Sequence, residues 1–145
     1  MGRLDLLKPL RLTNSASIGL LLLRIVAGLA FVFHGYGKIQ NPFAWMGPDA
    51  GVPGFLQMLA AVAEFGGGIA WILGLLTPLF SIMLAITMVV AAYMHAVVLG
   101  DSFVATGTGQ GSYELAAVYL CVALLLLLAG PGRISVDRML FGEKG

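Results

Sequence analysis

The chain has 145 residues, of which 59% are hydrophobic and only 10% are charged, and its mean hydropathy is +0.97. Soluble domains carry about 25% charged residues and keep much of their surface in water, so this composition excludes an ordinary soluble domain. The formal net charge of +1 also excludes a strongly basic surface for nucleic acid. The chain is predicted to be an all-α polytopic membrane protein with lipid as its main partner, because helices satisfy their own backbone groups in a bilayer.

Four apolar stretches are long enough to cross the membrane, which needs about 20 helical residues. Together they predict a four-transmembrane-helix bundle that forms one membrane domain over residues 1–145. The predicted spans cover about residues 16–37, 55–76, 79–99 and 113–130.

The first stretch begins after a basic segment, and Asn14 or Ser15 is expected to cap its helix. Arg24 interrupts the apolar run and no small-residue cleavage site follows, so the segment is predicted to be an uncleaved cytosolic lead-in rather than a signal peptide. At 100° per residue, one face of the helix carries a narrow stripe with His34 on its flank. The stripe contains Arg24, Gly28, Phe31, Gly35 and Lys38.

The second stretch carries Glu64 near its middle, with Gln57 on the same face. A charged group in hydrocarbon costs about 3 kcal/mol or more and should find a partner inside the bundle. An arginine side chain is long enough to bridge the estimated depth difference, so the sequence predicts a buried Arg24–Glu64 pair. This pair has either a purely structural role, fixing the register of the helices, or a role in a site.

Between the second and third stretches, Thr77-Pro78 predicts a tight break, with the proline in the first turn of the next helix. His95 lies about one turn from the outer end of the third stretch. Glu114 opens the fourth, with Ser112 as its expected cap. The single cysteine, Cys121, excludes an intramolecular disulfide or a CxxC pair and is expected to be a packing residue.

Most lysine and arginine residues outside the predicted spans lie at the two chain ends. The loops at 39–54 and 100–112 each carry one aspartate and no basic residue, whereas the two chain ends are basic. The positive-inside rule therefore predicts that both termini are cytoplasmic and that these two loops face outward. The basic residues are Arg3, Lys8 and Arg11 before the first span and Arg133, Arg138 and Lys144 after the fourth.

Four polar groups from three helices are expected near the outer boundary, namely His34, Lys38, His95 and Glu114. They predict an outer polar chamber, since an apolar pocket with a few convergent polar groups is the usual form of a ligand site. Simpler roles stay open for each group. The lysine could extend to the headgroups, the glutamate could be a helix N-terminal charge, and the histidines could be satisfied core residues.

The order of these residues resembles the DoxX family over nearly the whole chain. The segments that carry the resemblance are Arg24, HGYGK at 34–38, EFGGGIAWILGLLTP at 64–78, His95, YEL at 113–115 and GPGRISVDR at 130–138. Proteins of this family are four-helix membrane proteins of bacteria and archaea. Some are similar to membrane subunits of thiosulfate:quinone oxidoreductase, and others are linked to oxidative stress.

The resemblance implies a quinone-linked oxidoreductase subunit with a quinone as its ligand, and the expected location is the cell inner membrane. No metal is expected, because the sequence shows no obvious metal-binding cluster. A quinone head needs hydrogen-bond donors and a proton path, and imidazole exchanges protons near neutral pH. Because the chain has no CxxC and no flavin-type motif, the electrons must come from a partner protein or a bound cofactor. The expected catalytic residues are His34, His95 and Glu114, and the expected ligand contacts are Lys38, Arg24, Glu64, Gln57 and Tyr113.

Two other classes of function remain open. His34 and His95 lie at similar depth and could ligate a haem, as in a cytochrome subunit, although this would leave the basic stripe unexplained. A non-catalytic transporter, scaffold or assembly protein would use the buried charges only for packing. A face of small residues, Gly66, Ala70 and Gly74, could pack inside the bundle or between copies in a homo-oligomer.

Overall fold

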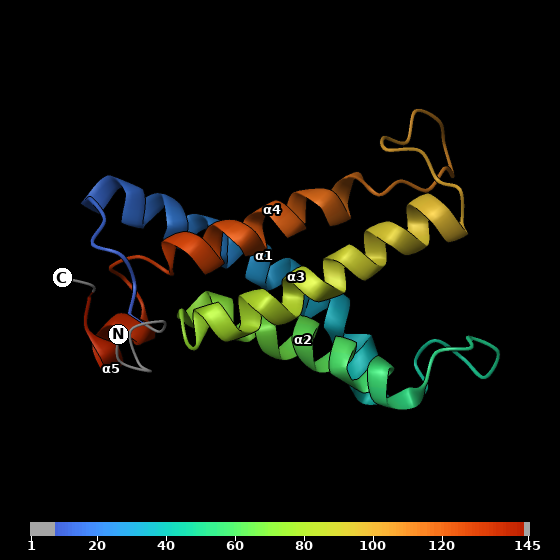
Figure 1. Cartoon of the computed structure of the whole chain (residues 1–145), viewed down its shortest axis with the longest axis horizontal. Coiled ribbons are helices and arrows are strands. Elements are labelled where there is room, and N and C mark those ends of the chain that lie inside the picture. The colour runs from blue at the N-terminus through green and yellow to red at the C-terminus, as the bar shows by residue number, and fades with distance from the viewer. Residues whose placement is uncertain (1–7, 144–145) are drawn as a thin grey trace.

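The computed structural model describes residues 8–143, and every regular element within that range is a helix (Figure 1). The helices are α1 (Asn14–Gln40), α2 (Gly54–Leu73), α3 (Thr77–Tyr93) with its π-helical continuation η1 (Met94–Val98), α4 (Glu114–Ala129) and the short α5 (Val136–Phe141). This confirms the all-α fold class.

The four predicted spans correspond to the apolar helices α1, α2, α3 with η1, and α4. Three of them are long and apolar enough to cross a membrane, namely α1, α2 and the continuous segment Thr77–Val98, while α4 is a shorter apolar helix of 16 residues. The proline expected in the first turn of the third helix lies there. The short α5 was not predicted, and Ser135 caps it by accepting a hydrogen bond from the Arg138 backbone N–H.

Both predicted caps of the long helices are wrong. Thr13 caps α1, because it is the last residue with extended backbone and its hydroxyl accepts from Ala16 N–H. Tyr113 precedes α4 and gives no side-chain cap. Ser112 instead pairs with Ser102 in an isolated β-bridge that closes the base of the 100–112 loop.

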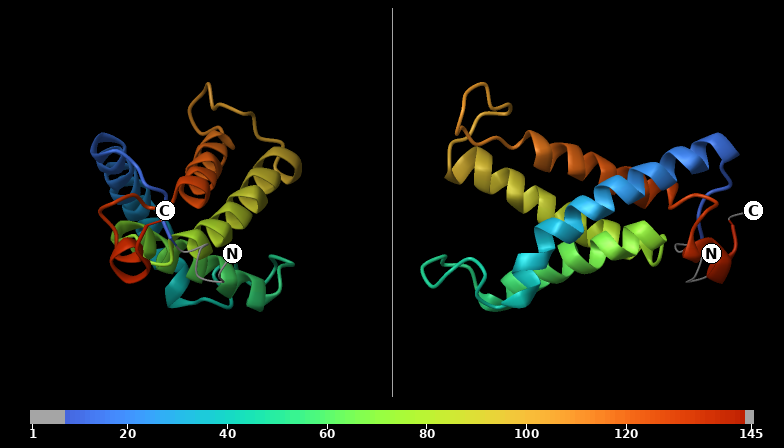
Figure 2. Two further views of the ribbon diagram at one scale, coloured as in Figure 1. Left: turned by 60° about the vertical axis from the view of Figure 1, so that its left-hand side comes forward. Right: turned by 180° about the vertical axis from the view of Figure 1, so that it is seen from behind.

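The helices form two hairpins, α1 with α2 and α3 with α4, which meet mainly where α2 packs on α3. In all three views the two hairpins diverge toward the ends that carry the loops 41–53 and 99–113 (Figures 1 and 2). The α2–α3 turn, α5 and the described N-terminal segment gather at the opposite end (Figure 1). The described chain ends therefore lie at one end of the bundle, and the membrane side of that end stays a prediction.

Glycines set the register between α1 and α2. A Cβ at Gly28 would lie 2.7 Å from the Gly68 carbonyl oxygen, and a Cβ at Gly68 would lie 2.6 Å from the Gly28 carbonyl oxygen. Farther along, Gly35 packs directly on the backbone of Phe65. The closest contact between α1 and α2 is therefore made by Gly28, Gly35 and Gly68. Gly66, from the predicted small-residue face, lies instead against Phe80 of α3.

Candidate functional site

Arg24 is completely enclosed, with 1% of its surface exposed, and it binds backbone carbonyls rather than Glu64. Its Nε donates to the Trp71 carbonyl at 2.7 Å and its Nη2 to the Ile72 carbonyl at 3.0 Å. Its Nη1 donates to the carbonyls of Pro131 and Ile134. The predicted Arg24–Glu64 pair is therefore wrong. The glycine-determined register of the hairpin places Arg24 beside the end of α2, not beside its middle.

The acceptors of Arg24 explain why a charge is tolerated there. The last carbonyls of a helix have no intrahelical partner and carry the negative end of its dipole, so a guanidinium at the end of α2 stabilises that end. The carbonyls of Pro131 and Ile134 belong to the segment between α4 and α5. Arg24 thus ties α1, the end of α2 and the chain before α5 together at one point.

Asp137 of α5 makes the complementary contact at the start of α3. It is 0% exposed, and its carboxylate accepts from the backbone N–H groups of Leu76 at 2.6 Å and Thr77 at 2.8 Å. Its own N–H donates to the Gly74 carbonyl at 2.8 Å. A carboxylate at a helix N-terminus is favourable, and this one also interacts with the Arg24 charge. We call Arg24, Asp137 and the turn residues 74–76 the turn anchor.

The turn anchor has no space for a side chain at Gly74. Gly74 has φ of +66°, and a Cβ there would lie 2.9 Å from the Arg24 guanidinium carbon and 2.6 Å from the Ser135 Cβ. Leu76 also has a positive φ, of 47°, which is uncommon for a residue with a branched side chain. The contacts of Asp137 hold this turn in place.

Glu64, in the middle of α2, pairs with Lys38 in the last turn of α1. The Lys38 Nζ lies 2.7 Å from each carboxylate oxygen of Glu64, and the two side chains are 25% and 5% exposed. The Trp45 ring covers the ammonium group, with its centroid 4.4 Å from Nζ. Lys38 therefore does not extend freely to the headgroups. It compensates the buried carboxylate and makes a cation–π contact.

Gln57, an expected ligand contact, organises the loop at 41–53. Its amide nitrogen donates to the Val52 carbonyl and its amide oxygen accepts from Met46 N–H, while its backbone carbonyl accepts from the Trp45 indole. A hollow of about 430 Å³ opens beside it in this loop, lined by residues from Phe43 to Gln57. Gln57 contributes to this lining, and the four groups of the predicted chamber do not.

On the other hairpin, His95 pairs with Asp101. The His95 Nδ1 lies 2.7 Å from the Asp101 Oδ2, and the side chains are 43% and 19% exposed. Asp101 N–H also donates to the His95 carbonyl at 2.8 Å. The histidine lies in the π-helical turn η1, a distortion that is frequent at functional sites. The carboxylate fixes the ring orientation and leaves Nε2 as the ring nitrogen available to a ligand.

Tyr113 and Glu114 lie at the start of α4, at the other end of the loop that carries Asp101. The Tyr113 ring contacts the Phe103 ring at a centroid distance of 5.3 Å. The Tyr113 backbone N–H donates to the Ser102 carbonyl. Glu114 is exposed in the first turn of α4, where its charge favours the helix N-terminus. His34 is also exposed, but on α1.

The predicted single chamber is wrong as drawn from the sequence. Lys38 is held by Glu64 on the α1–α2 hairpin, and His95 is held by Asp101 on the α3–α4 hairpin. These hairpins diverge toward the ends that carry the loops 41–53 and 99–113 (Figure 2). The outer polar groups therefore form two separate sets. His95, Asp101, Tyr113 and Glu114 belong to the α3–α4 end, which is the candidate site.

Sequence reasoning missed Asp101, Asp137 and Trp45 as functional partners. Asp101 follows His95 by six residues, and only the π-helical turn and the reversal at Gly100, with φ of +71°, bring them together. A signal for Asp137 was present, since Ser135 two residues earlier is a typical helix cap and an acidic residue is favoured in a first turn.

Within residues 8–143, no group of three or more His, Cys, Asp or Glu side chains lies close enough to hold a metal ion. The buried charged groups Arg24, Glu64 and Asp137 contact the backbone or a single oppositely charged side chain. A helical bundle of this size, with three helices long enough to span a bilayer and buried charges neutralised inside it, defines a small multi-pass membrane protein.

The comparisons with known proteins show which family this is. The DoxX family model matches residues 19–97, and the chain belongs to the DoxX family. The inner membrane protein YqjF of Escherichia coli is 33% identical over 129 residues, covering 85% of this chain and 92% of that protein. A protein of Haemophilus influenzae is 31% identical over 121 residues, covering 82% of this chain and 88% of that protein.

A third relative carries a name that suggests an activity. The Bacillus subtilis protein named "Putative oxidoreductase CatD" is 29% identical over 136 residues, covering 92% of this chain and 95% of that protein. The comparison with solved structures found no match.

Proposed function

We propose that this protein is the membrane subunit of a quinone-linked oxidoreductase system and binds a quinone-like ring beside His95. The observation that supports this most directly is the His95–Asp101 pair, 2.7 Å apart in a distorted and partly exposed helix end. A histidine oriented by a carboxylate is a typical general acid–base group. Reduction of a quinone to a quinol adds protons as well as electrons, so such a group has a role there.

In this proposal the ring lies at the α3–α4 end. His95 donates from Nε2 to a quinone carbonyl and passes a proton to it, while Asp101 stabilises the charged imidazole. Glu114 exchanges protons with the outer solution, and Tyr113 contributes ring contact. The apolar tail lies along the lipid-facing side of α3 and η1, where Val90 of α3 and Val97 and Val98 of η1 are exposed. His34, an expected catalytic residue, contributes only if the ring also reaches α1.

The electrons come from a redox partner protein, because the single cysteine cannot form a dithiol within one chain. The name of the Bacillus subtilis relative supports an oxidoreductase role, and that of the Escherichia coli relative supports an inner-membrane location. The basic residues at the chain ends support cytoplasmic termini, which place His95 near the outer boundary.

Quinone retention tests the proposal. The full-length protein, purified in mild detergent, is incubated with a short-tailed ubiquinone or menaquinone, and bound quinone is measured by mass spectrometry after extraction. His95→Gln should lower the affinity by at least tenfold, equivalent to about 1.4 kcal/mol. Asp101→Asn should lower it less, because Asn still orients the ring. Asp49→Asn, in the exposed loop of the other hairpin, is the charge-matched control and should bind normally.

Binding of neither quinone by the wild-type protein, or equal binding by wild type and His95→Gln, would contradict the proposal. The second candidate would then be preferred, namely a non-catalytic transporter, scaffold or assembly protein. The structure offers specific support for it, since Arg24, Lys38, Glu64 and Gln57 are all engaged in internal contacts. A visible absorption spectrum of the same sample tests the haem alternative.

A further inference from the structure

We propose that three arginines at the end of the bundle near α5 form a binding site for the phosphate of an anionic phospholipid headgroup. The arginine cluster consists of Arg11, Arg133 and Arg138, which come from the segment before α1, the segment before α5 and α5 itself. This inference is independent of the proposed quinone function, because α5 lies at the opposite end of the bundle from the 99–113 loop that follows the helical turn of His95 (Figure 1).

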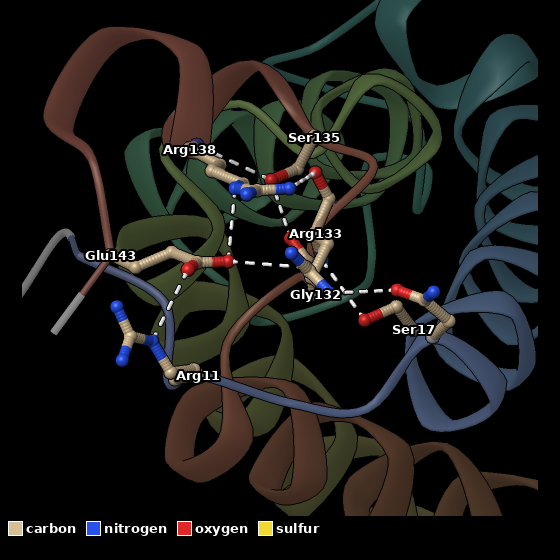
Figure 3. Close-up of polar contacts among 8 residues, drawn as sticks. Arg11, Ser17, Gly132, Arg133, Ser135, Arg138 and Glu143 are labelled. Carbon is tan, nitrogen blue, oxygen red and sulfur yellow. Dashed lines mark hydrogen bonds and ion pairs between the residues drawn. The ribbon is translucent and has the colours of Figure 1, made fainter.

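The three guanidinium groups surround one carboxylate, that of Glu143 (Figure 3). Glu143 lies 2.9 Å from the Arg138 Nε, 3.5 Å from the Arg133 Nε and 3.8 Å from the Arg11 Nε. Its side chain is 13% exposed. One carboxylate neutralises one of three positive charges, so the cluster retains an excess of positive charge and attracts a further anion.

Each arginine contacts Glu143 through Nε, which leaves terminal nitrogens for another acceptor. Arg133 Nη1 donates to the Asn14 side chain and Arg138 Nη1 to the Arg133 carbonyl. Within residues 8–143, the ion pair described for Arg11 runs from its Nε to Glu143, and Figure 3 marks no contact of its terminal nitrogens. Phosphate accepts several such N–H groups at once, and guanidinium groups bind it bidentately.

The surroundings of the cluster favour a lipid as the source of the phosphate. On α5, Met139 and Leu140 directly follow Arg138 and are 84% and 63% exposed, and Ile134 is also exposed beside Arg133. Large apolar side chains next to arginines suit the boundary between headgroups and acyl chains, where the apolar groups enter the hydrocarbon and the arginines remain at phosphate level. A dissolved phosphate ion would gain nothing from these apolar neighbours.

Glu143 occupies the position that the phosphate takes in this proposal. A phosphodiester has the same charge as the carboxylate, and its attached acyl chains add apolar contact with α5. The phosphate therefore displaces Glu143 from the arginines, and Glu143 acts as an internal competitor. Removing its charge should strengthen lipid binding, whereas removing an arginine charge should weaken it.

Lipid retention tests both expectations. The full-length protein is reconstituted in vesicles of equal parts phosphatidylglycerol and phosphatidylcholine and then solubilised, and the lipids that remain bound are counted by native mass spectrometry. Wild type should be enriched in phosphatidylglycerol. Arg11→Gln should lower the enrichment about fivefold, since a basic residue near an anionic membrane surface contributes about 1 kcal/mol. Glu143→Gln should raise it.

Matched variants control for charge and for folding. Arg11→Lys keeps the positive charge and should retain most of the enrichment, and Asp49→Asn removes a negative charge at the far end and should leave it unchanged. The Arg11 side chain is 78% exposed, so its replacement should leave the helix content measured by circular dichroism unaltered.

Equal enrichment in wild type and Arg11→Gln, or no gain from Glu143→Gln, would overturn the proposal. A parallel sample in phosphatidylcholine alone receives inorganic phosphate. If inorganic phosphate binds there with the same dependence on Arg11 and Glu143, and releases phosphatidylglycerol from the mixed-lipid sample, the site takes dissolved phosphate and the assignment to lipid fails.

Discussion

At the residue scale, the buried charges of this protein are satisfied in two different ways. Arg24 donates hydrogen bonds to backbone carbonyls at the end of α2, whereas the Glu64 carboxylate is neutralised by the side chain of Lys38. A charge that stabilises a helix terminus constrains chain geometry, and an ion pair constrains two side chains. The first arrangement holds the α2–α3 turn, and the second joins α1 to α2 beneath the 41–53 loop.

A double-mutant cycle distinguishes these arrangements. Lys38→Met and Glu64→Leu should be coupled by about 0.5–3 kcal/mol, because the groups are in contact, and each alone should cost about 3–5 kcal/mol as it strands the other charge. Arg24→Leu and Glu64→Leu should instead be additive within about 0.5 kcal/mol. Reversible unfolding in detergent supplies the free energies. Strong coupling between Arg24 and Glu64 would show that they are in contact.

At the scale of elements, the α1–α2 hairpin depends on glycines, which have no side chain to hold the two helices apart. Gly28 and Gly68 bring the two backbones so close that neither position has space for a methyl group. Lipid provides little hydrophobic force between helices, so this close packing is a main source of their association. The same contact sets the register that aligns Arg24 with the end of α2.

Gly68→Ala should therefore destabilise the bundle. The added Cβ would lie 2.6 Å from the Gly28 carbonyl oxygen and 2.8 Å from Val32 N, and overpacking of this kind costs about 1–3 kcal/mol. Gly19→Ala in α1 is the matched control, because nothing lies within 4 Å of a Cβ at that position. Thermal unfolding in detergent should show a lower midpoint for Gly68→Ala and no decrease for Gly19→Ala. Equal midpoints would indicate that the α1–α2 contact is not tight.

At the scale of the whole molecule, the two hairpins are joined closely at one end and separate toward the other (Figure 2). The turn anchor and α5 hold the joined end, where Arg24 and Asp137 connect α1, α2, α3 and α5 with the segment between α4 and α5. The separated end carries the two longer loops and the His95–Asp101 pair. Any change in the angle between the hairpins would move the candidate site more than the anchored end.

The membrane orientation is a prediction for the whole chain. In a protein with Cys121 replaced by serine, Pro48→Cys and Thr106→Cys should react with a membrane-impermeant thiol reagent added outside intact cells, because the loops that contain them lack basic residues. Ser15→Cys, at the opposite end and exposed, should react only after the membrane is permeabilised. Labelling of either loop site only after permeabilisation would reverse the orientation.

The sequence by itself determined the all-α class and the four apolar helices, because the length and hydropathy of each segment are local properties. It also identified the charges that needed partners, since a charge within an apolar run is costly wherever it lies. Thr77-Pro78 likewise predicted the start of α3 from local backbone chemistry. For the proposed catalytic residues, the sequence could identify individual candidates but not which of them lie close together.

Only the tertiary structure decided which partner each charge has. The α1–α2 register depends on contacts between Gly28 and Gly68, which are 40 residues apart in the sequence. This register places Arg24 beside the end of α2 and Lys38 beside Glu64. The His95–Asp101 pair depends on a π-helical turn that apolar periodicity does not reveal. The divergence of the hairpins separates polar groups for which the sequence predicts similar depths along the membrane normal. Depth can be counted along a helix, but lateral position depends on packing between helices, and this is why the single chamber was predicted and two separate sets of polar groups were found.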